Sequence, residues 1–136
     1  MTYSLGAKSQ EKLKGVHPDL VKVVSRAITI SEVDFTVLEG LRSIERQKQL
    51  FAAGKSKTMN SRHITGHAVD LAPYPINGDF DSDGILNIED WDAYHPIARA
   101  MKKAAAELGV SIEWGGDWKS FPDGPHYQLS HKVYPA

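Results

Sequence analysis

The amino-acid sequence predicts a single α+β domain with a small, mainly antiparallel sheet and flanking helices. Its 136 residues match the size of one ordinary domain. Helical and strand-like patterns follow one another in an irregular order, which favours α+β over repeated βαβ units. No internal repeat, low-complexity tract or Pro/Gly/Ser-rich linker divides the chain. We therefore expect one domain over residues 1–136.

In the first part of the chain, two helical patterns flank a short strand. Pro18 suits the first position of a helix. Apolar residues then recur at helical spacing, at Leu20, Val23, Val24, Ala27 and Ile28. A β-like alternation over residues 35–38 predicts a strand, and residues 43–53 predict a helix that ends at Gly54.

In the second part, the apolar run 68–72 predicts a buried strand. A helical pattern then extends over residues 88–108, at Ile88, Trp91, Ile97, Met101, Ala105 and Leu108. Pro96 lies inside this pattern, so the sequence allows either two helices or one kinked helix. Residues 110–114 and 126–129 predict two more strands around a glycine-rich loop.

Composition excludes several classes of function. With 16 basic and 17 acidic residues the net charge is −1, so the chain has no general basic surface for nucleic acid or anionic membranes. No segment has the length of a membrane span, and residues 1–16 lack the apolar region of a secretory signal. We expect a monomer made in the cytoplasm, without membrane insertion.

The residue types available as metal ligands are restricted. The chain has no cysteine, which leaves histidine and carboxylate side chains as the strong ligands. From His63 to Ala98 there are seven acidic residues and no lysine or arginine. This local excess suits a bound cation, although a solvated acidic loop has the same composition.

Three candidate ligands lie close together at His63, His67 and Asp70. His63 and His67 would share one face of a helix, but Gly66 and the β-like run after it argue against a helix. If the chain turns at Gly66, His63 lies in the loop before the strand and Asp70 lies on it, so both can reach one ion. Burying Asp70 in an apolar strand is costly unless it is paired or binds a metal. Taken singly, an exposed loop histidine and a strand-edge carboxylate are the simpler interpretations.

Two separated motifs resemble a known group of enzymes. Their spacing is Ser61-x-His63-x-x-Gly66-x-Ala68-x-Asp70 and Asp123-x-x-His126. Both motifs are similar to those of the zinc D-Ala-D-Ala and L-Ala-D-Glu peptidases of the hedgehog/DD-peptidase fold group, which includes phage endolysins and bacterial carboxypeptidases. The similarity also includes Gln47 and residues 39–43, so it extends through nearly the whole chain.

The resemblance implies that His63, Asp70 and His126 bind zinc and that Asp123 is the catalytic carboxylate. Three protein ligands leave a fourth position for water, which is the arrangement of catalytic rather than structural zinc. A carboxylate beside that water can take its proton and deliver it to the leaving amine. An ordinary turn aspartate in Pro-Asp-Gly is the simpler interpretation of Asp123 alone.

The resemblance also implies a substrate site lined by Arg42, Gln47 and Ser61, in which Arg42 acts in catalysis. The planar guanidinium of Arg42 matches a substrate carboxylate, although a surface arginine is the simpler interpretation. His67 matches no ligand position, and we assign it to the wall of the site or to the surroundings of the ligands. Three aromatic residues could line the cleft but suit core packing better: Trp114, Trp118 and Tyr127.

A second ion site is predicted over residues 79–90, which follow the calcium-loop template. Acids stand at positions 1, 3, 5 and 12, and a backbone carbonyl is offered at position 7: Asp79, Asp81, Asp83, Asp90 and Ile85. The closing acid is aspartate rather than glutamate, which weakens binding. A polar turn without an ion is the alternative.

The motifs together predict a phage or prophage endolysin that cleaves the L-alanyl-D-glutamate bond of the peptidoglycan stem peptide. The missing export signal fits an enzyme that stays in the cytoplasm until lysis. A D-Ala-D-Ala carboxypeptidase or dipeptidase of the same fold is the first alternative. A metal-stabilised binding module without catalysis is the second, but such a module needs no base three residues from a ligand, as Asp123 is from His126.

Overall fold

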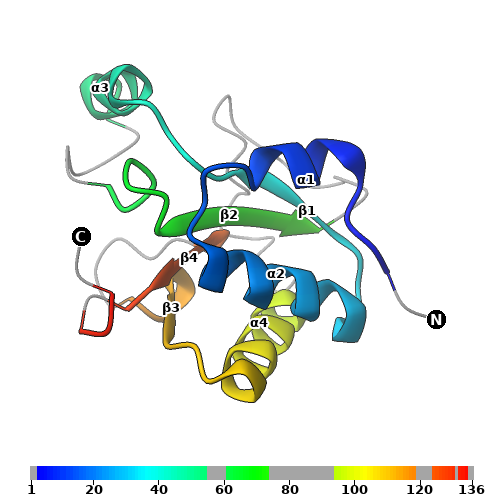
Figure 1. The fold of residues 1–136 in the computed structure, drawn as a ribbon. Helices are drawn as coiled ribbons and strands as arrows, with labels where there is room; N and C mark the ends of the chain where they lie inside the picture. The colour runs from blue at the N-terminus through cyan, green and yellow to red at the C-terminus, as the bar shows by residue number, and fades with distance from the viewer. Residues whose placement is uncertain (1–2, 55–60, 74–93, 119–123, 131, 135–136) are drawn as a thin grey trace.

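The computed structural model describes residues 3–54, 61–73, 94–118, 124–130 and 132–134. Figure 1 shows its elements, which are, in chain order, α1 (Ala7–Lys12), α2 (Pro18–Ile30), β1 (Phe35–Glu39), α3 (Ile44–Ala52), β2 (Ala68–Pro73), α4 (His95–Leu108), β3 (Ile112–Trp114), the 3-10 helix η2 (Gly115–Asp117) and β4 (His126–Leu129). This mixture of helices and strands confirms the predicted α+β class.

The strands form one sheet in the order β1-β2-β4-β3, and every neighbouring pair is antiparallel. Successive side chains of a strand point to opposite faces of a sheet. Val69 and Leu71 on β2 are therefore buried in the hydrophobic core, while Asp70 between them points to the other face. The predicted antiparallel sheet is confirmed.

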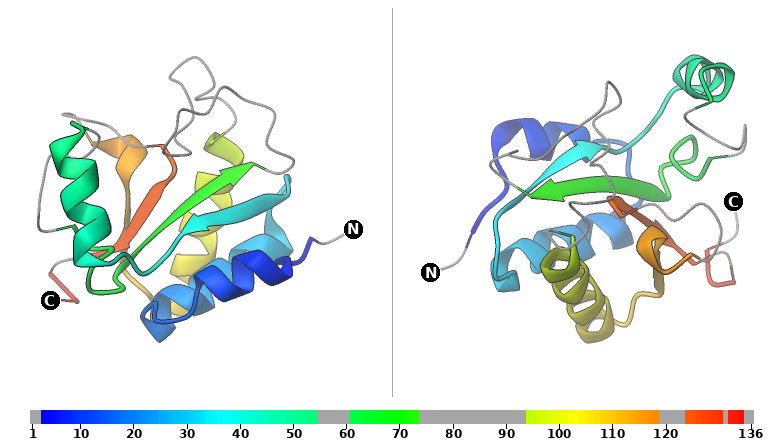
Figure 2. Two further views of the ribbon diagram at one scale, coloured as in Figure 1. Left: turned by 90° about the horizontal axis from the view of Figure 1, so that it is seen from above. Right: turned by 180° about the vertical axis from the view of Figure 1, so that it is seen from behind.

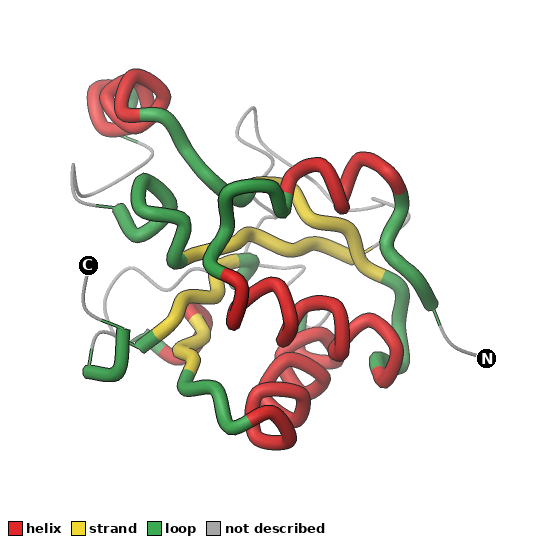
Figure 3. Tube along the Cα trace, in the orientation of Figure 1, coloured by secondary structure: helices red, strands yellow, loops and turns green. Residues whose placement is uncertain are grey.

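One face of the sheet is covered by α2 and α4, which pack against each other (Figures 2 and 3). The buried positions of α2 are the five apolar residues of the predicted helical pattern. The buried face of α4 is rich in alanine, which lets the two helices approach closely: Ile97, Ala98, Ala100, Met101, Ala104 and Ala105. The core therefore lies between these helices and the sheet.

The ends of α2 and α4 follow from their local sequences. His17 caps α2, because its Nδ1 accepts a hydrogen bond from the Asp19 backbone N–H at 3.1 Å. Pro96 lies in the first turn of α4, where its missing N–H costs nothing, so it starts this helix instead of kinking it. Gly109 ends α4 in the left-handed conformation, with φ 69°. Residues 88–93, where the helical pattern was predicted to begin, lie outside the described residues.

The short helix α1, which the sequence patterns did not predict, covers the outer edge of β1. Ser9 of α1 is buried, and its Oγ accepts the Val37 N–H at 3.0 Å and lies 2.9 Å from Thr36 Oγ1. An uncovered edge strand would leave such backbone groups without partners. The hydrogen bond from Val37 to Ser9 therefore gives a backbone N–H at the edge of the sheet a partner.

Helix α3 stands apart from the layer formed by α2 and α4 (Figure 1). Ser43 caps it, since its Oγ accepts the Arg46 N–H at 3.1 Å. Only Gln47 and Leu50 of this helix are buried. Across the described residues, none of the helices has the length and apolar character needed to span a membrane.

Candidate metal centre

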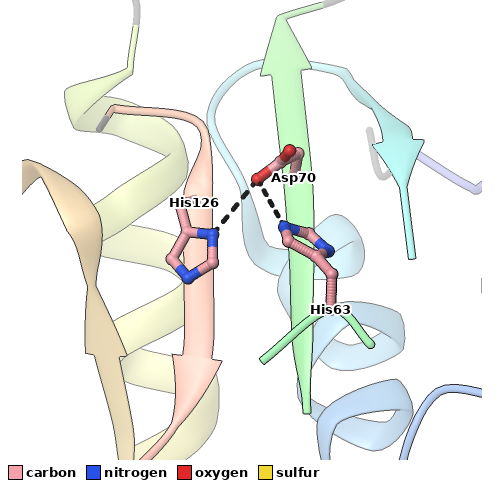
Figure 4. A group of neighbouring side chains, drawn as sticks. All are labelled: His63, Asp70 and His126. Atoms are coloured by element: carbon pink, nitrogen blue, oxygen red, sulfur yellow. Dashed lines mark hydrogen bonds and ion pairs between the residues drawn. The ribbon is translucent and has the colours of Figure 1, made fainter. Parts of the chain in front are cut away.

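Three predicted ligands come together on the face of the sheet opposite α2 and α4 (Figure 4). Asp70 on β2 stands directly opposite His126 on β4 in the antiparallel register. His63 reaches them from the turn before β2. His63 Nε2 lies 3.2 Å and His126 Nδ1 lies 3.4 Å from Asp70 Oδ1. The three potential ligand atoms all lie within 4.8 Å of one another, so the cluster could hold one metal ion.

The hydrogen bonds of His63 orient it for metal binding. Its Nδ1 lies 2.9 Å from the Gly40 carbonyl oxygen, which can only accept, so Nδ1 carries the proton. In the neutral ring the lone pair of Nε2 then points at Asp70 Oδ1. Two acceptors face each other at 3.2 Å unless a proton or a cation stands between them. A carbonyl that fixes the tautomer of a metal-binding histidine is a common arrangement around protein metal sites.

His126 is held in a similar way by its own strand. Its Nε2 lies 2.8 Å from Oε1 of Gln128, two residues along β4 and on the same face of the sheet. When that oxygen accepts the Nε2 proton, Nδ1 is left to bind a metal. The ring of Trp118 lies beside the His126 ring, with 5.1 Å between their centroids. Trp118 therefore borders the cluster, whereas Trp114 and Tyr127 are buried in the core.

Asp70 stays ionised in this environment. Its burial would raise the pKa of the carboxyl group, but the charge that His63 carries when protonated and the hydrogen bonds with both histidines outweigh burial and hold the pKa well below its usual range. The two histidines thus compensate the cost of burying a carboxylate in an apolar strand. An ionised carboxylate at this point favours a cation as its neighbour.

The turn that carries His63 is fixed by a close backbone approach. Gly66 has φ 76°, and a Cβ at this position would lie 2.4 Å from the Gly15 carbonyl oxygen. Only glycine fits there, which confirms the predicted turn. His63 also accepts the Arg42 N–H on its backbone carbonyl at 2.9 Å, and Ser61 Oγ accepts the His63 N–H at 3.2 Å.

Arg42 lies at the border of the cluster and is largely buried, with 9% of its side chain exposed. Its Nε and Nη2 each donate to one oxygen of the Glu39 carboxylate at 2.7 Å. Its Nη1 donates to Gln47 Oε1, also at 2.7 Å. Nη2 lies 3.7 Å from Asp70 Oδ2, the oxygen that faces away from the histidines. Glu39 directly follows the apolar part of β1; the family resemblance includes this residue but implies no role for it.

The remaining predicted residues are placed as follows. His67 is not part of the cluster; its ring lies beside His17, with centroids 5.4 Å apart, and its Nδ1 is 2.8 Å from Thr65 Oγ1. Gln47 is fully buried beneath Arg42. Asp123 and the predicted calcium ligands lie outside the described residues: Asp79, Asp81, Asp83, Ile85 and Asp90.

The fold defines a structural class. The chain superimposes on the vancomycin-resistance D,D-dipeptidase VanXYg with a TM-score of 0.57, over 84% of this chain and 50% of that one. Their sequence identity is 16%, so this likeness concerns the fold alone. The domain therefore has the DD-peptidase fold that the motifs predicted.

Closer relatives define the family. The model of the family "Phage L-alanyl-D-glutamate peptidase" matches residues 1–133. The L-alanyl-D-glutamate peptidase of Escherichia phage T5 is 36% identical over 137 residues, covering 98% of this chain and 94% of that protein. The crystal structure of the Serratia marcescens L-Ala D-Glu endopeptidase ChiX is 50% identical, with a TM-score of 0.82 over 96% of this chain and 92% of that one. The chain belongs to the phage L-alanyl-D-glutamate peptidase family.

Proposed function

We propose that this protein is a zinc-dependent endopeptidase that hydrolyses the bond between L-alanine and D-glutamate in the peptidoglycan stem peptide. The observation that carries this proposal is the cluster of His63, Asp70 and His126, in a chain of this family. Relatives named for this activity match almost the whole chain. As a phage or prophage endolysin, the protein would meet its substrate in the cell wall during lysis.

Zinc is the metal that suits this donor set best. Zinc takes histidine nitrogen and carboxylate oxygen at about 2.0–2.2 Å in a tetrahedron, so two of its ligands stand about 3.3 Å apart. The distances from Asp70 Oδ1 to the two histidine nitrogens are 3.2 and 3.4 Å. Two imidazoles and one carboxylate leave a fourth position, as in catalytic sites.

The proposed reaction consumes one water molecule. When bound, zinc would lower the pKa of a coordinated water to about 7 and polarise the substrate carbonyl. The Asp123 carboxylate is proposed to take a proton from the attacking water and to deliver it to the nitrogen of D-glutamate as the C–N bond breaks. The water oxygen forms a bond with the carbonyl carbon of L-alanine, and both water protons end on the nitrogen of D-glutamate. The products are an L-alanine carboxylate and a D-glutamate ammonium group, so atoms and charges balance.

Arg42, Gln47 and Ser61 are proposed to contact the substrate. Glu39 accepts hydrogen bonds from Nε and Nη2 of Arg42, and Nη2 lies 3.7 Å from Asp70 Oδ2, so the guanidinium borders the candidate metal ligands. A guanidinium there suits an acidic substrate group such as the carboxylate of D-glutamate. Gln47 helps to hold the guanidinium through its hydrogen bond with Nη1.

Residues 79–90 are proposed to bind calcium weakly, through the four aspartates and the Ile85 carbonyl named above. The short closing aspartate suggests an affinity on the order of 10⁻⁵ to 10⁻³ M. Calorimetric titration of zinc-loaded protein with calcium tests this proposal, with Asp81→Ala combined with Asp83→Ala as the negative control. Absence of binding heat at millimolar calcium would contradict it.

Mass spectrometry of purified muropeptides tests the proposed function. We expect wild-type protein to release products with a new D-glutamate amino terminus, and chelation of the metal to stop their release. Asp123→Asn should keep the metal and the fold while activity falls ~100-fold or more. Release of terminal D-alanine instead would identify a D-Ala-D-Ala carboxypeptidase, and intact muropeptides would indicate a binding module.

A further inference from the structure

A histidine and two acidic residues form a row across the sheet at the cluster. In the antiparallel registers, His126 on β4 is opposite Asp70 on β2, and Asp70 is opposite Glu39 on β1. Residues directly opposite one another point to the same face and lie side by side. Glu39 is therefore the neighbour of the shared ligand Asp70, on the side away from His126.

An irregularity in β1 creates this arrangement. Val37 pairs with Leu71 and Glu39 pairs with Asp70, so the register shifts by one residue and Leu38 is left without a partner. In an unbroken ladder Leu38 would stand opposite Asp70. Bulges of this kind re-aim side chains and are frequent beside active sites. Here the bulge places a carboxylate where an apolar side chain would otherwise stand.

Glu39 in turn decides how Arg42 meets Asp70. The Glu39 carboxylate accepts two hydrogen bonds from Arg42, both at 2.7 Å, whereas the contact of Arg42 with Asp70 Oδ2 is a single long one of 3.7 Å. A buried guanidinium strongly prefers a bidentate carboxylate partner. Among the described residues, Asp70 is the other acid whose carboxylate lies within ion-pair distance of the same guanidinium. A bidentate pair with Arg42 would turn Asp70 away from the histidines.

We infer that Glu39 is a positioning residue that occupies Arg42 and thereby keeps Asp70 available to the metal. This inference rests on the metal site of the proposed function. Arg42 Nη2 then lies near Oδ2 of Asp70, while Oδ1 of Asp70 faces His63 and His126. Partners that orient metal ligands typically affect metal affinity by 10–100-fold.

Zinc titration of the metal-free protein by calorimetry tests the inference without relying on activity. We expect Glu39→Gln to weaken zinc binding by about 10-fold, because the amide cannot hold both donors of Arg42. Replacing the arginine as well, in Glu39→Gln with Arg42→Gln, should restore the affinity to within a few fold of wild type. Glu32→Gln, at an exposed glutamate just after α2, is the control and should bind zinc as wild type does.

The outcomes separate this inference from the proposed function. Absence of zinc binding in the wild type would overturn the zinc site itself. Wild-type affinity in Glu39→Gln would overturn only the role of Glu39. If the double variant binds zinc as weakly as Glu39→Gln or more weakly, the glutamate acts through the local structure and the inference is wrong. Melting curves of the metal-free variants show whether each one is folded at the temperature of the titration.

Discussion

At the scale of single residues, contacts within the protein hold the candidate ligand His63 in place. His63 has 2% of its area exposed and is fixed at four points: its Nδ1 by Gly40, its backbone N–H by Ser61, its carbonyl by Arg42, and its Nε2 beside Asp70. Ligands that are already immobilised lose little conformational entropy on binding.

The first prediction concerns the three ligands. His63→Ala, Asp70→Ala and His126→Ala should each lose stoichiometric zinc, because each variant removes one of the three donor atoms. Zinc content after gel filtration, measured by atomic absorption, checks this expectation. His67→Ala is the matched control and should keep its zinc, since its ring lies beside His17 instead. A full complement of zinc in His126→Ala would refute the ligand assignment.

The second prediction concerns Gly40, whose carbonyl fixes the tautomer of His63. A Cβ at this position would lie 2.1 Å from the backbone oxygen of Lys12 and 2.8 Å from Val16 Cγ2. Because the backbone at the end of α1 cannot move cheaply, Gly40→Ala should destabilise the protein by about 1–3 kcal/mol or more.

Urea unfolding of the metal-free protein measures this effect. Gly6→Ala is the control, since nothing lies within 4 Å of the added Cβ, and its cost should stay below about 1 kcal/mol. Equal unfolding midpoints for Gly40→Ala and wild type would show that α1 does not press on this glycine.

At the scale of elements, sequence patterns predict what depends on neighbouring residues along the chain. The apolar run around Asp70 is sufficient to predict β2, and the helical spacing after Pro18 predicts the buried face of α2. Helix α1 is not predicted because its six residues bury only Ser9 and lack the helical spacing of apolar residues on which such a prediction depends.

In the site, too, features that depend on contacts between distant segments are not predicted from local patterns. The resemblance of the two motifs to zinc peptidases implies that His63, Asp70 and His126 converge, and the structure brings them together. The role of Glu39 depends on the bulge at Leu38, which exists only once β1 is paired with β2. Cross-strand register is a property of two segments, so the sequence of either one alone does not contain it.

The third prediction tests how α1 holds the edge of the sheet. Ser9→Ala should cost about 1–3 kcal/mol, because the buried Val37 N–H loses the oxygen that accepts it. Urea unfolding gives the loss of stability, and amide hydrogen exchange at Val37 should become faster. Ser25→Ala, at an exposed position of α2, is the control and should change stability by less than about 0.5 kcal/mol. Unchanged stability in Ser9→Ala would mean that α1 contributes nothing to the edge.

At the scale of the whole molecule, the metal would join parts of the chain that are distant in sequence. His63 and Asp70 come from the turn before β2 and from β2 itself, whereas His126 comes from β4, beyond α4 and β3. These segments are adjacent only in the folded sheet, so the unfolded chain offers no comparable site. An ion that binds only the folded state stabilises it by mass action.

The fourth prediction follows from this coupling. Free zinc at 100 times its dissociation constant should stabilise the domain by about 2.7 kcal/mol, which corresponds to a rise in melting temperature of roughly 8–12 °C. The rise should shrink as the pH falls from 7.5 to 5, because histidine must be unprotonated to bind zinc. Asp70 takes up no proton in this range, since its neighbours hold its pKa below the usual value of about 3.9.

Melting curves with zinc and with chelator at both pH values test the prediction, with His126→Ala as the control that should show no shift. A zinc-dependent shift of equal size at pH 5 and pH 7.5 would mean that the histidines do not bind the ion.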